Sequence, residues 1–262
     1  EMSGRITSQY FSSIAASAPC AQSPVTLRCT DEMSERPYFD ISLQMMAEFG
    51  AVAEREGYRQ AKFPAGNPYR GRVLTVEGDY SSASFFFLAA AICGTAVTVS
   101  GLSADTRQGD RGFLDLLERM GCDVAESPAG IRVEGPGAGL KAVEQDMDSM
   151  PDLVPPIAVA AAFAQGTSRF TGIAQLRVKE CDRLAVMVSQ LGEMGVSADC
   201  DRDSLTVEGG RPHGARIDPH NDHRIAMSFA AAGLATGGQV IQNPDCVAKS
   251  FPDFWERFAV FG

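Results

Sequence analysis

One arrangement of helices repeats along the chain, and this repeat constrains the fold more than any other feature of the sequence. A small, polar or charged residue opens an Ala-rich apolar run four times, at Ser8, Ser82, Asp152 and Arg224. Successive openings are 74, 70 and 72 residues apart. The runs that follow them are 10–18, 83–93, 157–165 and 225–235. A regular period of this length indicates one supersecondary unit that is used several times.

A second helical pattern has the same period. Amphipathic runs that end in a glycine stop at Gly50, Gly121 and Gly195, which are 71 and 74 residues apart. Short β-like segments follow or intervene, such as 97–99 and 205–207. Each unit is therefore predicted to hold a helix, a strand, a second helix and a pair of strands. The alternative is a coincidence among ordinary α/β elements, and the agreement of the two periods argues against it.

Composition excludes several classes of function. The 262 residues suffice for one large or two ordinary domains, with 45% apolar and 21% charged residues. A net charge of −10 argues against a nucleic-acid binder, because affinity for the phosphate backbone needs clustered Lys and Arg. No apolar run reaches the roughly 20 residues of a membrane span, and the first residues do not resemble a signal peptide. The chain begins inside a segment predicted to be ordered, so we expect a fragment.

The cysteines indicate a reducing environment. There are seven, an odd number, and they lack Cys-x-x-Cys spacing. Only three histidines are available to complete a metal site. We therefore expect free thiols, a cytoplasmic location and no metal.

Three charged motifs point to a small anion site. The segment 177–183 carries five charges of both signs between two apolar stretches, and the motifs 221–224 and 249–252 each add a basic residue. Glu180 is available for proton transfer, although Glu180 and Arg183 could equally form a surface ion pair at i, i+3 spacing. The basic side chains available for phosphate or carboxylate are Lys179, Arg183, Arg224 and Lys249.

The helix-opening residues have two possible roles. Asp152 suits a helix N-cap, but its carboxylate could also take a proton from a substrate hydroxyl. Ser81, Ser82, Asp152 and Arg224 occupy equivalent positions, where backbone N–H groups and the helix dipole favour anions. His223 is expected to position Arg224 rather than to transfer protons.

The first helix and the segment after Pro37 offer further candidates. Thr7, Ser8 and Gln9 could hold phosphate or sugar-like hydroxyls, or could form an ordinary cap. Tyr38 could stack on a ring or fill the core.

With these residues in view, the chain closely resembles the family of 5-enolpyruvylshikimate-3-phosphate (EPSP) synthases. The resemblance implies the enolpyruvyl transferase fold, an inside-out α/β barrel with two lobes of three βαβαββ units each. Residues 1–75 would be the last unit of an incomplete lobe, and residues 76–262 the three units of the other lobe, giving four of six units. The matching segments are 3–10, 37–40, 76–91, 108–110, 150–152, 176–184, 222–227 and 248–253.

The resemblance also implies a reaction. The enolpyruvyl group of phosphoenolpyruvate would move to the 5-hydroxyl of shikimate 3-phosphate with release of phosphate, without a cofactor or metal. Asp152 would lie beside the reacting hydroxyl, and Glu180 would exchange a proton at the enol carbon. Arg183, Arg224 and Lys249 would hold phosphoenolpyruvate, a task for which the arginine fork is suited. The residues implied to bind shikimate 3-phosphate are Thr7, Ser8, Gln9, Tyr38, Gln175 and Lys179.

The sequence departs from the family pattern in two respects. Glu35 stands where the family usually has a phosphate-binding Ser, so either Ser34 substitutes or the pocket is altered. The family's N-terminal lysine and further cleft residues have no counterpart, so we expect this chain alone to be inactive or nearly so. Other possibilities are a related transferase acting on UDP-N-acetylglucosamine, a non-catalytic ligand-binding half, or a subunit that needs the missing N-terminal half.

Overall fold

The computed structural model describes residues 1–66 and 68–261, which form two compact units. Unit 1 consists of residues 1–76 together with the short segments 105–109 and 148–150. Unit 2 holds residues 77–104, 110–147 and those from 151 onward.

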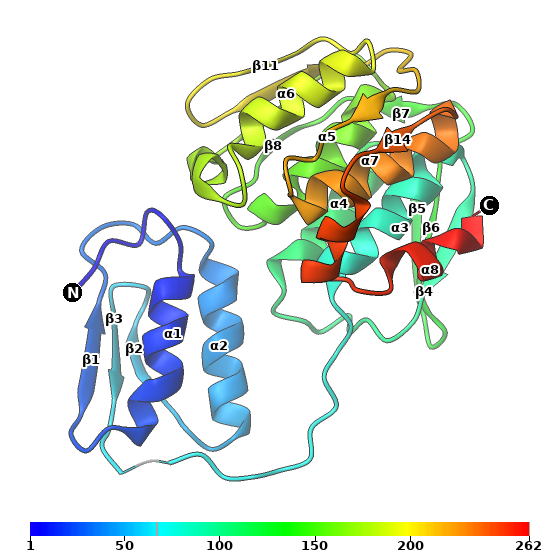
Figure 1. Ribbon diagram of the computed structural model, residues 1–262. Helices are drawn as coiled ribbons and strands as arrows, with labels where there is room; N and C mark the ends of the chain where they lie inside the picture. The colour runs from blue at the N-terminus through cyan, green and yellow to red at the C-terminus, as the bar shows by residue number, and fades with distance from the viewer. Residues whose placement is uncertain (67, 262) are drawn as a thin grey trace. The chain divides into compact units, whose positions relative to one another are not determined.

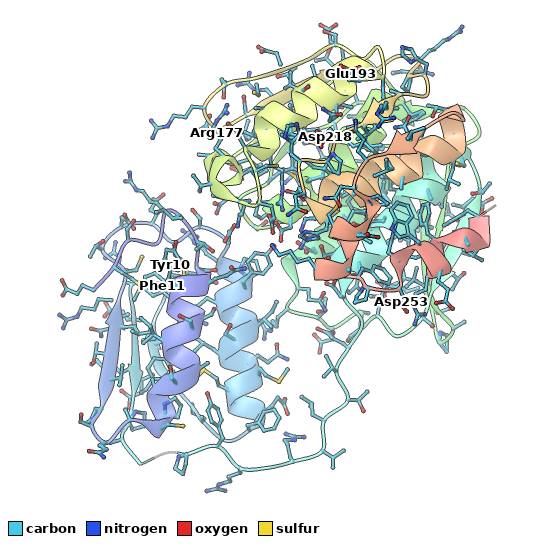
Figure 2. The ribbon with its side chains drawn as sticks, in the orientation of Figure 1. Tyr10, Phe11, Arg177, Glu193, Asp218 and Asp253 are labelled. Carbon is cyan, nitrogen blue, oxygen red and sulfur yellow. The ribbon has the colours of Figure 1, made fainter. Side chains whose placement is uncertain are left out.

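Unit 1 is a layer of two helices on an antiparallel sheet (Figure 1). The helices are α1 (Gln9–Ser17) and α2 (Arg36–Glu48), and the strands are β1 (Val25–Arg28), β2 (Glu54–Glu56) and β3 (Gln60–Phe63), in the order β1-β3-β2. Neighbouring side chains of α1 differ sharply in their exposure to solvent: Tyr10 is 52% exposed, whereas Phe11 is 2% exposed. Both residues are labelled in Figure 2. Phe11 meets Phe39 of α2 edge to face, with 6.1 Å between ring centroids. This contact joins the two helices over the sheet.

Unit 2 contains three successive α/β segments. The first has α3 (Tyr80–Cys93), β4 (Ala96–Val99), α4 (Gly112–Arg119), β5 (Asp123–Ser127) and β6 (Gly130–Glu134). The second has β7 (Leu140–Lys141), β8 (Glu144–Asp146), α5 (Val154–Ala162), β9 (Ala164–Gln165), β10 (Thr167–Thr171), α6 (Arg183–Glu193), β11 (Ala198–Cys200) and β12 (Leu205–Glu208). The third has β13 (Arg216–Ile217), α7 (His223–Thr236), β14 (Val240–Ile241) and α8 (Phe254–Phe258).

The order of elements confirms the predicted repeat. A helix, a strand, a second helix and a strand pair follow one another in α1 to β3 and in α3 to β6, and α5 to β12 has the same order with two strands, β9 and β10, between its helices. The fourth opening helix, α7, is followed by β14 and α8 without a strand pair in the described residues. Gly50, Gly121 and Gly195 follow the second helix of each set with φ of 87°, 104° and 77°. Glycine adopts this left-handed conformation without the strain that a Cβ brings, which explains why it recurs there.

Sheet pairing also recurs within unit 2. The sheets run β4-β6-β5 and β11-β12-β10-β8, where β10 pairs antiparallel with β12 and parallel with β8. Two further parallel pairs, β7 with β9 and β13 with β14, each flank a helix of the Ala-rich set.

The core of unit 2 is built from the Ala-rich helices. Every residue of α5 is buried, and α3, α5 and α7 pack against one another (Figure 1). Alanine lets helix axes approach closely, so an all-round apolar helix can lie inside the unit. Short 3-10 helices, η2 (Gly109–Arg111), η3 (Pro151–Leu153), η4 (Ala174–Val178) and η5 (Pro244–Lys249), lead into or out of the longer helices.

The C-terminal segment positions Lys249. The 3-10 helix η5 packs on α7. Phe254 of α8 is fully buried and meets Phe85 of α3 edge to face, with 6.2 Å between centroids. Lys249, the last residue of η5, is therefore held between two segments anchored to the core.

Candidate functional site

The charged loop before α6 has a defined local structure. Asp182 is the N-cap of α6, and its carboxylate accepts a hydrogen bond from the backbone N–H of Ala185 at 3.1 Å. Arg177, labelled in Figure 2, donates to the other oxygen of Asp182 at 2.8 Å. This capping fixes the start of α6 at Arg183.

A cluster of charged side chains lies at the start of α6, and its members are Asp152, Glu180, Arg183, Asp222, Arg224 and Lys249. Arg183 is the centre of this cluster and is only 1% exposed. Its Nε, Nη1 and Nη2 atoms donate to Asp222, Asp152 and Glu180 at 2.7, 2.9 and 2.7 Å. Burial acts to lower the pKa of Arg183, but the charges of Asp152 and Asp222 raise it above the ordinary value. The interpretation of Glu180 and Arg183 as a surface ion pair is therefore wrong.

Asp152 lies between two arginines. Its carboxylate contacts Arg183 at 2.9 Å and Arg224 Nη2 at 2.8 Å. Burial acts to raise the pKa of Asp152, but the charges of Arg224 and then Arg183 outweigh it and lower the pKa well below the ordinary value. The N-cap residue of α5 is Leu153, and Asp152 belongs to η3, so the interpretation of Asp152 as a cap is wrong.

Glu180 joins the loop before α6 to the C-terminal segment. Lys249 Nζ donates to Glu180 Oε1 at 2.5 Å, and His223 Nδ1 lies 4.0 Å from the same oxygen. Burial acts to raise the pKa of Glu180, but the hydrogen bond from Lys249 and the charge of Arg183 lower it to about 2. In this arrangement Glu180 is an ionised hydrogen-bond acceptor, and it would gain basicity if Lys249 turned towards another anion.

His223 is buried beside these charges. Burial and the positive charge of Arg224 lower the pKa of His223 below the ordinary value. The ring is therefore neutral at pH 7, which agrees with the expected positioning role.

Two of the expected helix-end anion sites are closed by side chains. The carboxylate of Asp79 accepts from the N–H groups of Ser81 and Ser82 at the start of α3. Asp222 accepts in the same way from Arg224 and Ile225 at the start of α7. The expectation of open helix ends is thus wrong for α3 and α7, and the positive charge of the cluster comes from side chains.

The other candidates in unit 2 lie around the cluster. The charge of Lys179 contributes to the low pKa of Asp152, so its ammonium group lies near that carboxylate. Gln175, in η4, is 6% exposed and donates through Nε2 to the carbonyl of Gly172 at 3.2 Å.

The candidates in unit 1 gather around Glu35. Thr7 Oγ1 donates to Glu35 Oε2 at 2.5 Å, and Ser8 Oγ donates to the Glu35 carbonyl at 2.7 Å. Glu35 is fully buried, and its φ of 56° is unusual for a residue with a Cβ. Ser34 instead donates to the carbonyl of Arg5. The hydroxyl of Thr7, expected to face a phosphate, contacts a carboxylate here, which supports the altered-pocket alternative.

The remaining two candidates of unit 1 flank these contacts. Gln9 is exposed at the first position of α1, and Tyr38 is half-buried in the first turn of α2.

Sequence reasoning missed one residue of the cluster and one residue beside it. Asp222 is fully buried, pairs with Arg183 and caps α7. Its position before an Ala-rich helix, next to His223 and Arg224, was the available signal. Asp110, in η2, is also buried, and burial and then the charge of Asp152 raise its pKa, while the charge of Arg224 opposes them.

Across residues 1–66 and 68–261, no group of His, Cys, Asp and Glu could hold a metal ion. In the same ranges, no helix is long and apolar enough to cross a membrane. All seven cysteines are free thiols.

Comparison with known proteins places the chain in a class and then in a family. The structure matches the enolpyruvyl transferase NikO from Streptomyces tendae with a TM-score of 0.70 at 19% identity, over 94% of this chain and 57% of that one. EPSP synthase from Acinetobacter baumannii gives a TM-score of 0.79 at 29% identity, over 98% and 60%. The fold is thus that of the enolpyruvyl transferases, as the resemblance implied.

The family follows from sequence similarity. The profile of EPSP synthase (3-phosphoshikimate 1-carboxyvinyltransferase) matches residues 1–258, and the chain belongs to this family. The 3-phosphoshikimate 1-carboxyvinyltransferase of Methanoculleus marisnigri is 47% identical over 259 residues, which are 99% of this chain and 61% of the relative. That of Syntrophobacter fumaroxidans is 44% identical over 256 residues, or 97% and 60%. The chain therefore spans about 60% of the length of these relatives.

Proposed function

We propose that the chain supplies the proton-transfer and phosphoenolpyruvate-binding groups of an enzyme that transfers an enolpyruvyl group to shikimate 3-phosphate. The observation that carries the proposal is the single network in which Arg183 and Arg224 hold Asp152, and Arg183 and Lys249 hold Glu180. Two carboxylates fixed by three cations are the groups needed for addition of a hydroxyl to an enol phosphate and the subsequent elimination of phosphate.

The cations have different tasks in this proposal. Arg183 is buried and each of its three side-chain nitrogens donates to a carboxylate, so it positions these carboxylates. Arg224 and Lys249 are the cations that would meet phosphoenolpyruvate, because their side chains are 15% and 60% exposed. When Lys249 turns to the ligand, Glu180 loses its closest cation and becomes able to take up and deliver a proton. Asp152 starts ionised, accepts a hydrogen bond from the attacking hydroxyl group and takes its proton as the new C–O bond forms.

The remaining candidates complete the proposal. Thr7, Ser8, Gln9 and Tyr38 would contribute to the shikimate 3-phosphate side from residues 1–75, the last unit of one lobe. Gln175 and Lys179 would do so from residues 76–262, the lobe of three units. Because the chain spans about 60% of its relatives, we expect the reaction to need groups that it does not hold.

The test is phosphate release from phosphoenolpyruvate and shikimate 3-phosphate. The 262-residue chain is assayed alone and after mixing with the part of the Methanoculleus marisnigri relative that it does not match. We expect no turnover by the chain alone and turnover by the mixture. Glu180→Gln should abolish turnover, whereas Glu193→Gln, an exposed change at the end of α6 (Figure 2), should not.

Three outcomes would count against the proposal. Steady turnover by the chain alone would show that the missing groups are not needed. A mixture that binds both substrates without turnover would indicate a ligand-binding half. Turnover with UDP-N-acetylglucosamine but not with shikimate 3-phosphate would indicate the related transferase.

A further inference from the structure

Asp110 is a buried acid beside the cluster that the proposed reaction does not use. It lies in η2, directly before α4, and is 5% exposed. Within residues 1–66 and 68–261, its Oδ1 atom is buried and has no hydrogen-bond partner. A buried carboxylate oxygen without a partner is costly, so this side chain calls for a physical explanation.

A short chain of hydrogen bonds connects Asp110 to Arg224. Arg224 Nη1 donates to the hydroxyl oxygen of Ser81, and the Ser81 side chain hydrogen-bonds the Asp110 carboxyl. A guanidinium group can only donate, and a serine hydroxyl has a single hydrogen. The direction is therefore fixed from Arg224 through Ser81 to Asp110. Any change of charge on Asp110 acts on the orientation of Arg224.

The surrounding charges make Asp110 easy to protonate. Burial is the largest cause that raises the pKa of Asp110, and the carboxylates of Asp152 and Asp79 raise it further. The charge of Arg224 acts in the opposite direction, and the resulting pKa is about 7. The adjacent Arg111 is engaged elsewhere, since its Nη2 donates to Glu126 at 2.7 Å. Arg224 is thus the cation that favours the ionised form of Asp110.

We propose that Asp110 is a positioning residue that holds Arg224 through Ser81 and takes up a proton from solvent when an anion binds to Arg224. The inference rests on the proposed role of Arg224 as an anion ligand. A bound dianion uses the charge of Arg224, so the carboxylate of Asp110 loses its compensation and is neutralised. Neutral Asp110 then no longer competes with the ligand for the guanidinium group.

The test uses sulfate, a dianion that does not itself titrate near neutral pH. Sulfate affinity of the 262-residue chain is measured by calorimetry between about pH 6 and pH 9. Proton uptake is obtained from buffers of different ionisation enthalpy. Above pH 7 the wild-type affinity should fall by up to about tenfold per pH unit, with uptake approaching about one proton per sulfate. Asp110→Asn should show a flat profile and little uptake over this range.

Other titratable groups of the cluster do not mimic this profile. The pKa of His223 is lowered by burial, and that of Cys181 is raised by burial to about 12, so neither titrates between pH 7 and 9. Asp115→Asn, an exposed change in the first turn of α4, is the matched control and should behave as wild type. Uptake that persists in Asp110→Asn, or a flat wild-type profile, would overturn the proposal.

A second measurement needs no ligand. Infrared spectroscopy follows the carbonyl band of a protonated carboxyl group during a pH titration, and Asp110→Asn identifies the band. In Arg224→Gln the midpoint should move upward, because the opposing cation is gone. An unchanged midpoint in a folded variant would overturn the coupling. Failure of sulfate to bind, with the infrared shift present, would instead count against Arg224 as an anion ligand and hence against the proposed function.

Discussion

Replacing Arg183 by Met should lower the free energy of unfolding strongly, and the contacts show which of its three carboxylate partners would lose a cation. Asp152 keeps Arg224 at 2.8 Å and Glu180 keeps Lys249 at 2.5 Å, so both retain a cation. Asp222 is fully buried and loses the cation at 2.7 Å that Arg183 provides, although it keeps two backbone N–H donors at the start of α7. Removing one partner of a buried ion pair costs about 3–5 kcal/mol. We expect about 3 kcal/mol for Arg183→Met, because the capping bonds remain.

Urea denaturation at pH 7 measures this change in the free energy of unfolding. The double variant Arg183→Met with Asp222→Asn should recover part of the loss, because the buried carboxylate charge is removed together with its partner. Arg257→Met is the matched control: Arg257 pairs with Asp253 at 2.5 Å but is 64% exposed. Such surface pairs contribute about 0–1 kcal/mol. A loss below about 1 kcal/mol for Arg183→Met, or a double variant whose loss is the sum of the two single losses, would refute this reasoning.

Three further predictions concern local features. Gly195→Ala should lower the free energy of unfolding, measured by thermal denaturation, by more than about 1 kcal/mol, because φ is 77° and the new Cβ would lie 2.8 Å from His213. The control Gly192→Ala, in α6, should instead raise it by about 0.4–1 kcal/mol. Thr7→Val should cost about 1–3 kcal/mol by removing a hydrogen bond to the buried Glu35, and Thr7→Ser should cost less. The stability contributed by the lowered pKa of Glu180 should be present above pH 4.5 and be lost as pH falls towards about 2, so acid titrations of the unfolding free energy should show less loss in Glu180→Gln.

The repeat and the charged motifs were accessible from the sequence because both depend on local patterns. Helical spacing and the closing glycines predicted the order of elements, since a glycine after the last turn relieves strain whatever lies around it. The motifs around Glu180, Arg224 and Lys249 predicted an anion site from residue chemistry alone. These predictions required no knowledge of which segments meet in space.

Capping was harder to assign, because a polar residue near a helix start has several possible partners. Asp152 was as plausible a cap as Asp222, yet only Asp222 caps a helix. The difference lies in the arginines that reach Asp152 from α6 and α7, which no local pattern reveals.

The sequence by itself determined the α/β repeat, the family resemblance and the kinds of side chain at the site. Only the tertiary structure decided how charges are shared: Arg183 is buried and holds three carboxylates, Lys249 lies on Glu180, and Asp110 is connected to Arg224 through Ser81. The physical reason is that electrostatic interactions depend on distance and burial, and residues far apart in sequence come within 3 Å only when the helices pack.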